Sequence, residues 1–131
     1  MATIQDTSAK FVALNIPGLK TKKEFPPTSV SSAQLPYLYL RDLETGLVID
    51  TLSFGGGLQY VSGEAVILVG VSRQNTAEEL YKQTRRFMDD LQATLEANAD
   101  VLKLASWNIK EDFEAVDTSS YFVVLCTFRC V

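Results

Sequence analysis

The chain has 131 residues, of which 47% are hydrophobic and 21% charged, and its net charge at pH 7 is −4. A chain of this length and apolar content folds as one domain, residues 1–131, which excludes a disordered protein. The acidic balance argues against nucleic-acid binding as the main function.

The sequence contains no histidine. This removes serine–histidine and cysteine–histidine catalysis, histidine metal sites and a histidine pH switch. No apolar run approaches the ~18 to 20 residues that span a bilayer, and Met1–Lys10 lacks the basic and apolar regions of a signal peptide. We therefore expect a soluble cytoplasmic protein with no membrane association.

The two cysteines, Cys126 and Cys130, are four residues apart in an expected strand. At ~3.3 Å per residue they lie roughly 13 Å apart, whereas a disulfide needs Cα atoms within roughly 7 Å. We expect buried free thiols.

The N-terminal segment, residues 3–14, predicts a short helix. Thr3 and Asp6 resemble a capping pair, and one helical face would carry Ile4, Ser8, Phe11 and Val12. Pro17–Gly18 would end the helix. A strand over residues 11–16 remains an alternative.

Residues 20–35 predict an irregular arm, because they contain Pro26 and Pro27 and almost no periodicity. The segment is either a surface loop or an arm that orders against a neighbouring subunit. The candidate interface residues in it are Lys22, Lys23, Phe25, Pro26 and Pro27.

Strands are expected from Pro36 onward. Residues 37–40 and 47–52 predict a hairpin with its turn at Leu43–Gly46. Gly55–Gly57 follows without the lysine and serine or threonine of a phosphate loop, so we expect a loop tip. Phe54, Gly55, Gly56 and Gly57 are the second group of candidate interface residues.

Residues 65–71 are almost continuously apolar, which is typical of a central strand buried on both faces. One face would be covered by the long helix that follows. The other would be covered by a second helix or by a neighbouring subunit.

The segment Thr76–Asn98 predicts one long amphipathic helix. The buried stripe comprises Ala77, Leu80, Tyr81, Thr84, Phe87, Met88, Leu91 and Leu95. Asn75 with Glu78, or Thr76 with Glu79, would form a capping box at its start.

Two closing strands are expected after this helix. Residues 105–115 alternate between apolar and polar side chains, with Glu111 as the exception on the apolar side, and residues 121–130 are apolar on both faces. The predicted fold is α+β: a mainly antiparallel sheet of about four to five strands, one long helix and a short N-terminal helix.

Carboxylate pairs are the remaining catalytic possibility: Asp89–Asp90, Glu78–Glu79, and Glu111 with Asp112 and Glu114. Asp89 and Asp90 would lie about 100° apart around a helix and do not converge on one point. Asp112 and Glu114 share a face, but it is the regular polar face of the expected strand, and none of the spacings matches a calcium loop. We therefore expect no enzymatic activity, no cofactor and no metal.

The layout resembles the tail terminator or tail completion proteins of tailed bacteriophages. The likeness is carried by Leu35–Leu40 after the arm, by Ala65–Val71 leading into the long helix, and by the aromatic last strand Tyr121–Cys130. It covers most of the chain.

The resemblance implies a hexameric ring in the virion tail, assembled in the host cytoplasm. Such a ring caps the tail tube, stops its polymerisation and joins it to the head-side connector, while DNA passes without specific binding through an acidic lumen. A small α+β protein- or ligand-binding module is the alternative, and a hydrolase that uses carboxylates alone is a third.

Overall fold

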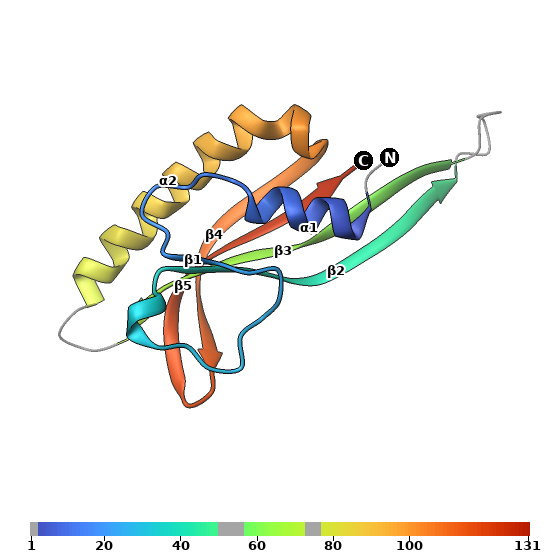
Figure 1. The fold of residues 1–131 in the computed structure, drawn as a ribbon. Coiled ribbons are helices and arrows are strands. Elements are labelled where there is room, and N and C mark those ends of the chain that lie inside the picture. Colours follow the sequence, from blue (N-terminus) through green and yellow to red (C-terminus); the bar gives the residue numbers. More distant parts are fainter. Residues whose placement is uncertain (1–2, 50–56, 73–76) are drawn as a thin grey trace.

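The computed structural model describes residues 3–49, 57–72 and 77–131. The elements are α1 (Ile4–Val12), β1 (Thr21–Lys22), the 3-10 turn η1 (Ser32–Gln34), β2 (Tyr37–Ile49), β3 (Gly57–Val71), α2 (Ala77–Leu102), β4 (Leu104–Val116) and β5 (Ser119–Cys130). They form one five-stranded mixed sheet with the order β1-β2-β3-β5-β4. β1 is parallel to β2, and the other neighbouring pairs are antiparallel. The predicted α+β class is confirmed (Figure 1).

Helix α1 begins as expected from the sequence. The Thr3 side chain caps it by accepting a hydrogen bond from the Asp6 N–H at 3.1 Å. Phe11 is buried and stacks on Phe128 of β5 with ring centroids 4.2 Å apart. The alternative strand over residues 11–16 is therefore wrong, because the local cap and the buried aromatic both favour the helix.

Helix α2 confirms the predicted stripe, with Thr84, Phe87, Leu91 and Leu95 buried against the sheet. It ends at Leu102, four residues beyond the predicted Asn98, because Leu102 continues the buried face. The left-handed backbone of Lys103, with φ at 57°, then ends the helix. The predicted caps at Asn75 and Thr76 lie outside the described residues.

One core lies between the helices and the sheet. β3 and β5 contribute alternate side chains to it, and the two cysteines are among them, buried and free as predicted. The sulfur of each cysteine is thus part of the apolar packing beneath α1 and α2.

A second core lies on the opposite face of the sheet. It contains Tyr37, Tyr39, Val66, Leu68, Val116, Tyr121, Val123 and Leu125. We had expected a second helix or a neighbouring subunit there. The chain instead places Val30 and Leu35 against this core, so the later half of the arm covers the face from which the helices are absent.

The arm is less irregular than predicted. Thr21 and Lys22 pair with Tyr37 and Leu38 as a short parallel strand, and the Lys23 N–H donates to the Leu38 carbonyl at 2.9 Å. The sequence shows little sign of this strand because two residues carry no detectable periodicity.

The predicted hairpin turn at Leu43–Gly46 is wrong. β2 continues to Ile49, and the register irregularity between Arg41 and Glu44, where Asp42 has φ at 53°, is a bulge rather than a reversal. A Cβ at Gly46 would overlap the Tyr60 ring, so a larger residue there would displace that ring. Gly57, expected at a loop tip, is the first residue of β3.

The sheet is strongly curled, and one contact between β2 and β4 demonstrates the extent of the curl. Arg41 of β2 lies 2.7 Å from Glu114 of β4, although β3 and β5 separate these strands. In a flat sheet the strands would be about 14 Å apart at ~4.8 Å spacing, and the register would add about 20 Å along the strand direction. The end of the β4–β5 hairpin therefore folds over the second core (Figure 1).

The helix stripe gives a stability prediction. We expect Leu91→Ala to lower the free energy of unfolding by about 2 to 5 kcal/mol, because Leu91 is 1% exposed and its loss leaves a cavity. Chemical denaturation measures the change. Arg86→Ala, on the exposed side of the same helix, is the control and should change stability by less than about 0.5 kcal/mol. A near-neutral Leu91→Ala would contradict the packing described above.

Candidate functional site

A two-stranded ribbon extends beyond the rest of the sheet. β5 pairs with β3 only from Val61 onward, so residues 57–60 pair with residues 46–49 of β2 alone. We call residues 45–49 and 57–60 the ribbon (Figure 1). It contains no charged residue, yet Leu47, Val48 and Leu58 are 56%, 52% and 59% exposed. A projecting ribbon that is apolar and uncharged has the composition of an interface core.

The two faces of the ribbon differ. Leu47 pairs with Gln59 on one face, and Val48 pairs with Leu58 on the other. Tyr60 lies on the same face as Leu58, and the Arg129 guanidinium stacks over its ring at 4.2 Å from the centroid. We call this second face, with Val48, Leu58, Tyr60 and Arg129, the cationic face of the ribbon.

A cleft with a volume of about 710 Å³ lies beside β2, at the foot of the ribbon. Its lining comes from α1, the arm and the bulge of β2: Ile4, Gln5, Ser8, Glu24, Phe25, Pro26, Leu40, Arg41, Asp42 and Leu43. The last backbone hydrogen bond from the arm to β2 is made by Lys23, and the cleft lies beside the following segment of β2. The Phe25 side chain at this cleft is 76% exposed.

The predicted interface residues separate into distinct locations. Phe25 and Pro26 line the cleft, and Lys23 and Pro27 are their neighbours in the arm. Lys22 makes a contact within its own subunit, because its Nζ donates a hydrogen bond to the Leu14 carbonyl at 3.1 Å. Gly57 lies at the end of the ribbon, while Phe54, Gly55 and Gly56 fall outside the described residues.

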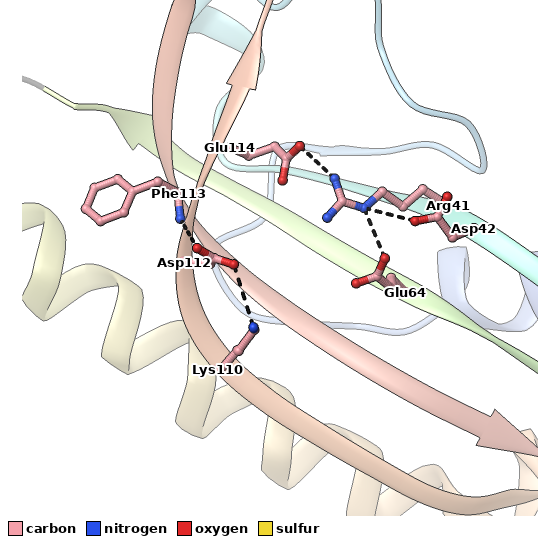
Figure 2. Close-up of polar contacts among 7 residues, drawn as sticks. All are labelled: Arg41, Asp42, Glu64, Lys110, Asp112, Phe113 and Glu114. Atoms are coloured by element: carbon pink, nitrogen blue, oxygen red, sulfur yellow. Dashed lines mark hydrogen bonds and ion pairs between the residues drawn. The ribbon is translucent and has the colours of Figure 1, made fainter.

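A charged cluster lies on the sheet face opposite the helices, at the edge of the second core (Figure 2). The Arg41 Nη1 lies 2.7 Å from Glu114 Oε1. The Arg41 Nε lies 3.4 Å from Glu64 Oε1 and 3.9 Å from Asp42 Oδ2, without making a hydrogen bond. Three carboxylates thus surround one guanidinium, and the Glu114 contact is the only one with the length of a strong charge-assisted hydrogen bond.

Burial and charge shift the pKa values of this cluster. Burial would lower the pKa of Arg41, but the hydrogen bond and charge of Glu114 outweigh it and the pKa is raised. Burial, followed by the neighbouring Asp42 carboxyl, raises the pKa of Glu64. Burial and then the negative charge of Glu114 raise the pKa of Tyr39 to about 12. The cluster therefore keeps Arg41 charged and disfavours the ionised form of Glu64.

The carboxylates considered for catalysis do not converge. Glu111 pairs with Arg85 of α2 at 3.3 Å, which explains why a charged residue occupies the helix-facing side of β4. Asp112 lies 3.8 Å from Lys110, and Glu114 pairs with Arg41. Within the described residues, no group of three or more acidic or cysteine side chains is arranged to hold a metal ion.

The two cysteine thiols are in environments that disfavour reactivity. Burial raises the pKa of the Cys126 thiol to about 12 and that of the Cys130 thiol to about 11. A thiol reacts as its thiolate, which is disfavoured at these values.

No protein-family model matches this chain, and no curated protein matches its sequence. Neither α1 nor α2 combines the length and apolar character needed to cross a membrane.

The sequence did not reveal the charged cluster or the cleft. The charged cluster joins residues of three strands that meet through the curl of the sheet, and the cleft joins residues of α1, the arm and β2. The one available signal was period-two alternation, which places Arg41 on the same face as Tyr37 and Tyr39.

The Arg41–Glu114 contact gives the second prediction. We expect Glu114→Gln to destabilise the protein by roughly 1 to 2 kcal/mol, because it removes the charge from a short hydrogen bond to a half-buried guanidinium. Glu64→Gln, at the longer contact, is the matched comparison and should cost less at pH 7. Equal losses in urea denaturation would contradict the assignment of Glu114 as the main partner.

The raised pKa of Glu64 gives a third prediction. A carboxyl with a raised folded-state pKa contributes stability below its unfolded pKa of about 4.3, and this contribution is lost as pH rises through the folded pKa. Glu64→Gln cannot titrate, so its stability relative to the native protein should improve from pH 4 to pH 7. Melting temperatures of both proteins across this range measure the effect. The raised pKa would be contradicted if the difference in melting temperature between the two proteins did not change with pH, or if the variant lost stability relative to the native protein as pH rises.

Proposed function

We propose that this chain is a structural protein of a bacteriophage tail. Identical subunits, six in the simplest case, would form a ring that caps the tail tube, stops its polymerisation and joins it to the head-side connector. The ring would be part of the virion after assembly in the host cytoplasm. The proposal assigns function to shape and interfaces and requires no catalytic group, cofactor or metal.

The observation that carries the proposal is the uncharged ribbon. Three large aliphatic side chains are about half exposed on a segment that has no core of its own. Burying apolar surface contributes roughly 25 cal/mol per Å², so contact with a protein partner is favourable. The resemblance of the layout to tail terminator proteins supplies the kind of assembly in which such a segment would be buried.

The charge of the chain is compatible with this role. A net charge of −4 per subunit is multiplied in a ring and repels the phosphate backbone. DNA could then pass through the lumen without binding to its wall.

The cleft favours a second candidate, a small α+β binding module. At about 710 Å³, and with apolar and polar residues in equal number along its lining, it falls in the size range of ligand pockets. In that case the protein would function as a monomer or dimer, and the ribbon would have no assembly role.

The oligomeric state and the effect on tube growth test the proposal. We expect sedimentation and negative-stain imaging to show closed annuli, alone or on tubes of the cognate tail-tube protein, and we expect added protein to arrest tube elongation. Tubes grown with an equal concentration of an unrelated acidic protein are the control. A chain that stays monomeric and leaves tube growth unchanged would contradict the proposal and favour the binding module.

A further inference from the structure

The cationic face of the ribbon and the cleft beside β2 complement each other. We infer that the cationic face of one subunit docks in the cleft of a second copy of the chain. This inference rests on the proposed ring and names the contact that would build it.

The apolar parts of the two surfaces match in character. The ribbon offers Val48 and Leu58, each more than half exposed, beside the Tyr60 ring. The cleft offers aliphatic side chains from α1 and β2, and Phe25 at 76% exposure adds an aromatic surface that its own subunit leaves uncovered. Docking would remove both sets of apolar surface from water, and enrichment in aromatic residues is typical of interface cores.

The charges of the two surfaces are opposite. Arg129, stacked on Tyr60, has no carboxylate partner among the described residues. The cleft contains two carboxylates, Glu24 and Asp42, and one cation, Arg41. Asp42 lies 3.9 Å from Arg41, whose short contact at 2.7 Å is with Glu114. The cleft therefore presents net negative charge to an incoming guanidinium, which fixes the register of the contact as well as its partner.

Each subunit carries one ribbon and one cleft, joined directly through β2. The cleft lining ends at Leu43 and the ribbon begins at Thr45. A contact between two different surfaces of the same chain can continue from subunit to subunit, and such a head-to-tail series closes into a ring when the rotation allows it.

A charge exchange tests the contact. Arg129→Glu and Glu24→Arg should each weaken self-association about tenfold or more, and the double variant should restore it, because the pair is rebuilt with its signs reversed. Arg86→Glu and Glu79→Arg, both exposed on α2, are the matched control reversals and should assemble normally. Circular dichroism melts verify that every variant is folded. Sedimentation velocity at matched concentrations measures association.

A mixing experiment tests whether the two surfaces meet in different subunits. Leu58→Asp disables the ribbon, and Glu24→Arg disables the cleft, but each variant keeps the other surface intact. Mixed together, they should form one-to-one dimers and nothing larger. A mixture that remains monomeric would overturn the inference. Dimers formed by either variant alone would also overturn it, because they would show contact between two like surfaces.

The outcomes separate this inference from the proposed function. If the native protein forms rings and both single charge variants still do so, the docking contact is overturned and the ring stands. If the double variant fails to recover while both controls assemble, the pairing of Arg129 with Glu24 is overturned. If the native protein forms no ring alone or on tubes, both the function and the contact fail.

Discussion

β3 and β5 are apolar on both faces, so each face of the sheet has to be covered for the chain to fold. Val66 of β3 and Val123 of β5 are fully buried on the face opposite α1 and α2. Exposing two central strands of this kind would cost free energy in proportion to their apolar area. Helices α1 and α2 cover one face, while the arm and the curled end of the β4–β5 hairpin cover the other.

The charged cluster lies where the curled end of the β4–β5 hairpin contacts β2. Arg41 and Glu114 belong to strands that do not neighbour each other, so their contact exists only when β4 has folded over the second core. Glu64 lies between them on β3, with its carboxylate disfavoured by burial. A half-buried guanidinium shared among carboxylates is costly to desolvate, and its retention is better explained by fixing one arrangement of strands than by stability alone.

The remaining surface divides into a scaffold and two contact regions. Helix α2 has a largely polar outer face, on which Lys82 pairs with Glu78. The ribbon and the cleft are different, since both carry apolar surface that the subunit does not bury itself. The proposed ring and its docking contact give both regions an occupant of the same kind, a second copy of the chain.

The sequence by itself determined the local elements. Periodicity and capping located α1, α2, β4 and β5, because helix and strand periods are written directly in the order of apolar and polar residues. It also indicated the double-sided burial of β3. The prediction for β2 was wrong, because Asp42 and Gly46 are residue types that favour turns. In the structure Asp42 lies in a bulge of this strand, and Gly46 lies under the Tyr60 ring.

Only the tertiary structure decided what covers the second core and where the charges meet. The curl of the sheet depends on the combined twist and bulges of several strands, which no single segment encodes. The same holds for the cleft, which exists because the arm diverges from β2 after Lys23. Elements follow from local order in the chain, whereas the cluster, the cleft and the exposed ribbon follow from contacts between residues far apart in it.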